Sequence, residues 1–248
     1  MATDSSGSRD SDATAEDLAD FLGLLNELKA TGCTLLVVGD ARPELFTRAS
    51  ANLFGDPAAT RYRLLAATDA EARSIADRLP DPDATPRPVS ETTKIVNHAD
   101  APRSITSAAR SSDSAKAVIP ETRVTDPRLD GLQSALVESI EEFARDAKGL
   151  RPGELRVGID SLGTLFDHHG REVVRRCLRK VGASVRDHDA MAHYLLEDDY
   201  DSERTRALAP DVDAVIEIRS DDAATHRHDA QQRWHVPSRD LTTDWVRL

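Results

Sequence analysis

The sequence predicts an α/β protein with a mostly parallel sheet, helices on both faces and a C-terminal antiparallel hairpin. Short continuous apolar runs, such as residues 34–39, have the composition of strands that are buried on both faces. These runs alternate with segments of helical periodicity, which is the order of βαβ units. The last two apolar segments, residues 231–236 and 243–248, have no helical segment between them and therefore predict the hairpin.

In the first half of the chain, the alternation of expected helices and strands is less regular than in the second half. We expect helices over residues 15–29, 43–54 and 69–79, and strands over 34–39, 61–67, 93–97 and 117–119. Four prolines make residues 80–91 a linker or an extended, mobile loop. Residues 99–116 are rich in Ser, Ala and Arg and predict a second mobile loop. Residues 1–15 are small, polar and acidic, which indicates a disordered tail before a single domain over residues 16–248.

In the second half of the chain, expected helices and strands alternate regularly. An amphipathic helix is expected from Asp126 to Gly149, because its leucines recur at helical spacing and Gly149 can end it. The remaining expected elements are a strand over 155–160, a helix over 173–181, a strand over 191–196, a helix over 202–208 and a strand over 214–218.

Composition excludes several classes of protein. The 248 residues contain no apolar run of about 18 residues, so no transmembrane helix is expected. The N-terminus lacks the basic and apolar regions of a secretory signal, which predicts a cytoplasmic protein. The two cysteines, Cys33 and Cys177, are too few and too far apart for a disulfide framework or a zinc finger. A net charge of −12 disfavours nucleic-acid and membrane partners.

The acidic excess has a simpler explanation than a partner. Only five of the 32 basic residues are lysines, and the chain is rich in Asp and Ala. This composition is typical of proteins from halophiles that accumulate salt, and we expect such a source. Because molar salt screens charge within about 3 Å, the −12 is interpreted as an adaptation to solvent.

Candidate site residues follow two of the expected strands. Parallel α/β sheets bind ligands at the carboxyl ends of their strands. The strand over 34–39 ends at Gly39, with Arg42 shortly after it, and the strand over 155–160 ends at Asp160 and is followed by Ser161. An aspartate at such a position holds Mg²⁺ in P-loop NTPases. The alternative is a structural carboxylate that caps or orients the next turn.

Two segments resemble the RecA/KaiC-like superfamily of P-loop ATPases. Residues 155–165, LRVGIDSLGTL, are similar to its Walker B strand, and residues 207–217, ALAPDVDAVIE, are similar to a later strand segment. The resemblance covers about residues 32–248. It implies a RecA-like sheet, ATP and Mg²⁺ as cofactors, and side-by-side association of domains.

The phosphate loop of that superfamily is eroded here. When GxxxxGK[ST] is laid from Gly39, the second glycine, the lysine and the hydroxyl residue fall on Glu44, Leu45 and Phe46. The chain therefore lacks the lysine that neutralises the phosphates and the hydroxyl that binds Mg²⁺. Asp40 also adds a carboxylate, and one such charge about 4 Å from a phosphate costs roughly 4 kcal/mol at an effective dielectric of 20.

The preferred hypothesis is a degenerate, non-catalytic KaiC/RecA-like domain: a pseudo-ATPase without a cofactor, a catalytic residue or a metal site. It would act as a regulatory or protein-interaction module that binds a protein partner or itself. The alternative is a KaiC-like signalling ATPase with a non-standard loop, in which Gly39, Arg42, Asp160 and Ser161 hold Mg²⁺-ATP. A metal- or DNA-binding module is the weakest hypothesis, since His168 and His169 are interpreted as a solvated loop.

Overall fold

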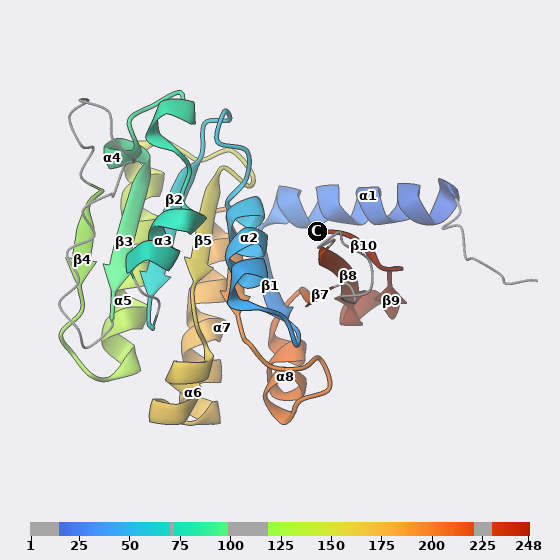
Figure 1. Ribbon diagram of the computed structural model, residues 1–248. Coiled ribbons are helices and arrows are strands. Elements are labelled where there is room, and N and C mark those ends of the chain that lie inside the picture. Colours follow the sequence, from blue (N-terminus) through green and yellow to red (C-terminus); the bar gives the residue numbers. More distant parts are fainter. Residues whose placement is uncertain (1–14, 70–71, 99–118, 221–229) are drawn as a thin grey trace, which may run out of the picture.

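Figure 1 shows the computed structural model of the chain, which describes residues 15–69, 72–98, 119–220 and 230–248. The expected mobile loop at 99–116 and all but the last residue of the expected acidic tail lie outside the described residues. No helix within the described ranges is long and apolar enough to cross a membrane.

One sheet forms the centre of the molecule, in the order β10-β8-β7-β1-β6-β5-β2-β3-β4, with β9 paired to β8. The strands from β7 to β4 in this order run parallel, and β8 pairs antiparallel with β7, β9 and β10. The strands are β1 (Cys33–Val38), β2 (Tyr62–Ala67), β3 (Thr93–Asn97), β4 (Glu121–Arg123), β5 (Leu155–Ile159), β6 (Met191–Leu195), β7 (Ala214–Ser220), β8 (Ala230–Val236), β9 (Leu241–Thr242) and β10 (Val246–Arg247). The predicted fold class, a mostly parallel α/β sheet with C-terminal antiparallel strands, is confirmed.

Helices cover both faces of this sheet (Figure 1). Helices α5 and α7 pack on one face through a large apolar cluster, while α2 and α3 pack on the other with part of α1. The α-helices are α1 (Ala15–Thr31), α2 (Pro43–Phe54), α3 (Ala72–Arg78), α4 (Val89–Thr92), α5 (Leu129–Asp146), α6 (Gly163–His169), α7 (Arg171–Asp187) and α8 (Glu203–Leu208). Within the described ranges, short 3₁₀ helices occupy Pro82–Ala84, Ala209–Asp211 and Pro237–Arg239.

The short strand expected at 117–119 lies mostly outside the described residues, and the edge strand β4, Glu121–Arg123, was not predicted because its polar residues carry no apolar signal. Three other predicted elements are corrected by the structure. His168 and His169 are expected in a solvated loop, but they lie in the last turn of helix α6, Gly163–His169. The helix expected at 173–181 is the middle of the longer α7. Within residues 80–91, the structure places a 3₁₀ turn and α4.

A histidine is packed into the core between α2 and β6. His193 is 2% exposed, its Nε2 lies 2.8 Å from Ser50 Oγ, and its ring meets that of Phe54 edge-on at 4.8 Å. Burial lowers the pKa of His193 to about 3, with smaller contributions from the charges of Arg78 and Arg156. The neutral imidazole is therefore the form that fits the core.

This packing predicts acid sensitivity. The native state keeps His193 neutral, whereas the unfolded chain takes up a proton below its usual pKa, so stability falls as the pH drops below about 6.5. Between about pH 7.5 and about pH 5, His193 alone should remove about 2 kcal/mol from the free energy of unfolding. Urea unfolding of the wild type and of His193→Gln at both pH values measures this loss, and an equal pH dependence in the two proteins would contradict it.

Candidate functional site

The loops after β1 and β6 enclose a cavity at the carboxyl edge of the sheet. Its volume is about 400 Å³, and its lining residues are Gly39, Asp40, Ala41, Glu197, Asp198, Asp199 and Ser202. Four of these residues carry carboxylates, and none of the described lining residues is basic. Burial raises the pKa of Glu197, and the charges of Asp69 and Asp160 add to that effect while Arg78 opposes it. The cavity is therefore unfavourable for a phosphate group.

The backbone N–H groups in this loop are also unsuited to a phosphate. Gly39 N–H donates to the carbonyl of Asp198 at 2.8 Å, and Leu45 N–H donates to the carbonyl of Arg42 at 2.9 Å. Pro43 is the first residue of α2 and has no N–H to offer. A phosphate loop works by aiming several such donors at the anion. In this loop the N–H groups of Gly39 and Leu45 already donate to carbonyl groups of the protein, and Pro43 has no N–H group.

Gly39 has a packing role that accounts for its presence. Its φ is 146°, and a Cβ at this position would lie 1.9 Å from the carbonyl oxygen of Ile218 on β7. Only glycine can occupy this position without displacing the backbone. The close approach of two strands, and not the approach of a phosphate, explains this glycine.

The lysine and hydroxyl positions of the phosphate-loop motif are occupied by residues that pack in the core. Phe46, which stands at the hydroxyl position of the motif, is fully buried in the apolar cluster beneath α2. Leu45 is partly buried against the same cluster, and Glu44 is exposed in the first helical turn. Arg42 is exposed at the N-cap of α2 and uses no side-chain atom to cap the helix. Helix α2 is therefore held in place by the packing of its apolar face in the core.

Asp160 is buried at the end of β5 and holds two strands together. It is 2% exposed, and its Oδ1 accepts hydrogen bonds from Thr68 N at 2.7 Å and from Thr68 Oγ1 at 2.6 Å. Its Oδ2 lies 3.8 Å from Nη1 of Arg78, which is 5% exposed. Thr68 Oγ1 also lies 2.7 Å from the carbonyl oxygen of Ser161. Asp160 therefore ties the end of β2 to the end of β5 and does not cap α6.

A second and larger cavity lies at the carboxyl ends of β2, β3, β4 and β5. Its volume is about 770 Å³. It brings His98, which follows β3, together with His168 and His169 at the end of α6. Sequence reasoning missed this group, because His98 is far from the histidine pair along the chain. The available signal was that His98, like Asp160, directly follows a predicted parallel strand.

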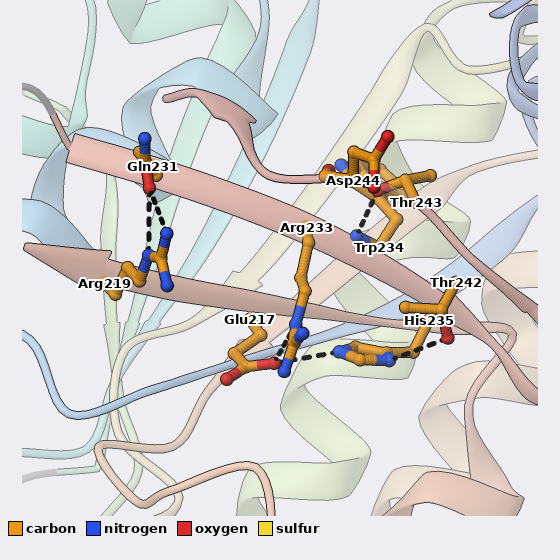
Figure 2. Close-up of polar contacts among 9 residues, drawn as sticks. All are labelled: Glu217, Arg219, Gln231, Arg233, Trp234, His235, Thr242, Thr243 and Asp244. Atoms are coloured by element: carbon orange, nitrogen blue, oxygen red, sulfur yellow. Dashed lines mark hydrogen bonds and ion pairs between the residues drawn. The ribbon is translucent and has the colours of Figure 1, made fainter. Parts of the chain in front are cut away.

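The antiparallel end of the sheet carries a polar network that is structural (Figure 2). Glu217 on β7 accepts hydrogen bonds from Arg233 Nε at 2.6 Å and His235 Nε2 at 2.9 Å, both on β8. The other ring nitrogen of His235 lies 3.2 Å from Thr242 Oγ1 on β9, and Tyr200 stacks on the ring at 3.9 Å. The network joins three strands, and none of the cavities described above includes these residues.

The fold and its carboxyl edge define the class: an α/β protein with a mostly parallel sheet, an acidic cavity after β1 and a histidine-lined cavity at the carboxyl ends of β2, β3, β4 and β5. The chain belongs to a family of unknown function, DUF7504, whose profile matches residues 32–218. A search of curated proteins found no match. The family thus covers β1 to most of β7, which includes both cavities.

Proposed function

We propose that this protein is a non-catalytic RecA/KaiC-like domain, a pseudo-ATPase that acts as a regulatory or protein-interaction module in the cytoplasm of a halophile. The carboxyl-edge placement of Gly39 and Asp160, on strands separated only by β6, supports the resemblance. The main observation in support of a non-catalytic domain is the acidic cavity after β1, which is lined by four carboxylates.

ATP and Mg²⁺ do not fit the residues that the resemblance would assign to them. A triphosphate beside Asp40 and Asp198 would be repelled, at roughly 4 kcal/mol for each carboxylate about 4 Å away before salt screening. The buried carboxylate of Asp160 is already bound to Thr68, so a Mg²⁺ ion would have to replace these hydrogen bonds. Because a nucleotide is disfavoured at this loop, we expect the protein to act by association with a protein partner or with a second copy of itself.

The test is binding of Mg²⁺-ATP to the purified protein in molar KCl, by calorimetry and thermal unfolding. We expect no heat and no shift in Tm. A ligand at about 100 times its Kd would stabilise the fold by about 2.7 kcal/mol, which corresponds to a rise of roughly 5–10 °C for a protein of this size. An authentic P-loop ATPase serves as the positive control.

Saturable ATP binding that is lost in Arg42→Ala would overturn the proposal and favour an ATPase with a non-standard loop. Arg42 suits this purpose because it is exposed, so its replacement should leave the fold intact. For the interaction part, sedimentation of the purified protein in molar KCl should show self-association, or capture from a high-salt lysate should yield a defined complex with a protein partner. A monomer that binds no protein under these conditions would contradict it.

A further inference from the structure

The histidine-lined cavity has the position and size of a small-molecule site. The carboxyl ends of parallel strands are where open α/β sheets bind ligands, and this cavity lies at the ends of β2, β3, β4 and β5. Its volume of about 770 Å³ falls within the usual range for such sites. A smaller cavity of about 370 Å³, between the starts of α5 and α7, shares Arg128, His168 and His169 with it.

The cavity gathers side chains that bind anions. The ring centroids of His98 and His169 are 6.2 Å apart, and those of His168 and His169 are 6.4 Å apart. His98 Nε2 lies 3.2 Å from the carbonyl oxygen of Asp126 and donates a hydrogen bond to it, because a carbonyl oxygen can only accept. Thr125 and Thr164 also line the cavity.

The charges around the three imidazoles balance when the histidines are neutral. The charged residues that line the two joined cavities are Asp69 after β2, Arg123 on β4, Asp126 and Arg128 before α5, Asp130 on α5 and Arg176 on α7. Arg128 is paired with Asp126 at 3.1 Å, and Arg123 lies 4.0 Å from Glu121. Protonation of the histidines therefore gives the residues that line these cavities a net positive charge, although the net charge of the chain is −12.

The histidines repel one another when they are charged. Burial lowers the pKa of His169, and the neighbouring charges of His98 and His168 lower it further. A dianion between the rings would remove this repulsion, so anion binding and histidine protonation should favour each other.

We propose that this cavity is a pH-dependent binding site for a small molecule that carries a dianionic phosphate or sulfate-like group, held by His98, His168 and His169. The site is separate from the acidic cavity after β1, so it can exist whether or not the protein binds ATP there.

The test is calorimetric titration of the full chain with sulfate, at constant ionic strength set by KCl. Sulfate stays dianionic between about pH 6 and about pH 8, so any pH dependence belongs to the protein. We expect binding to be several-fold tighter at the lower pH, because a histidine whose pKa rises by one unit on binding gives at most about a tenfold effect. Nuclear magnetic resonance of the imidazoles should show that rise for His169.

The variant is His168→Gln/His169→Gln, and the matched control is His188→Gln, which lies outside both cavities at the end of α7. The double variant should bind sulfate at least about tenfold more weakly at the lower pH and lose the pH dependence, while the control binds as the wild type does. Circular dichroism confirms that both variants are folded. The proposal is overturned by absence of sulfate binding, by binding that the double variant retains, or by binding of Zn²⁺ alone to these histidines without sulfate.

Discussion

The variant Gly39→Ala should be strongly destabilised even though it adds a single methyl group. Gly39 has a φ of 146°, a conformation that L-residues rarely adopt, and its Cβ would lie 1.9 Å from the Ile218 carbonyl oxygen. We expect about 1–3 kcal/mol from the backbone conformation and a further ~1–3 kcal/mol from the displaced strand. The sum is a large part of the total stability of a typical domain, about 5–15 kcal/mol. Urea unfolding measures the difference.

Gly163→Ala is the matched control. Gly163 is the first residue of α6, and its Cβ would make only an ordinary contact, 3.8 Å from Ser161 Oγ. Alanine is the better helix former there, so this variant should be as stable as the wild type or gain about 0.5–1 kcal/mol. If Gly39→Ala proved as stable as Gly163→Ala, packing against Ile218 would not explain Gly39. Its interpretation as part of a phosphate loop would then again be the better explanation.

The sequence predicts the central strands well because burial on both faces gives each of them a continuous apolar signal. Both β1 and β2 are buried at every position and coincide with expected runs to within a residue. The edge strand β4 has no such signal, since its three residues are polar and half-buried or exposed. Helix α6 is only seven residues long, too short to show periodicity.

The site was harder to predict, because its contacts join residues distant in the chain. An aspartate at the end of β5 can be read from the sequence, but its partner Thr68 lies 92 residues away, directly after β2. The order of the strands, which places β2 beside β5, decides that they meet. Local patterns do not encode this order. For the same reason His98 could not be joined to His168 and His169 before the structure placed β3 and α6 around one cavity.

Asp160→Ala should show directly that this carboxylate is structural. The substitution removes the acceptor of both Thr68 hydrogen bonds and leaves the guanidinium of Arg78 buried without its ion-pair partner. Breaking a buried pair by removing one partner costs about 3–5 kcal/mol, because the remaining charge is uncompensated. The matched control is Asp199→Ala, an exposed carboxylate in the acidic cavity, which should change stability by less than about 0.5 kcal/mol.

A Mg²⁺ titration separates this structural role from a catalytic one. If Asp160 held Mg²⁺, the ion would raise the Tm of the wild type, and it would not raise the Tm of Asp160→Ala. If Thr68 and Arg78 are its partners, Mg²⁺ leaves the Tm of the wild type unchanged, and the loss in Asp160→Ala is the same with and without the ion. The buried hydrogen bonds at 2.6 and 2.7 Å lead us to expect the second result. If Mg²⁺ changed the Tm of the wild type but not that of Asp160→Ala, Asp160 would instead be interpreted as a Mg²⁺ ligand of a nucleotide site.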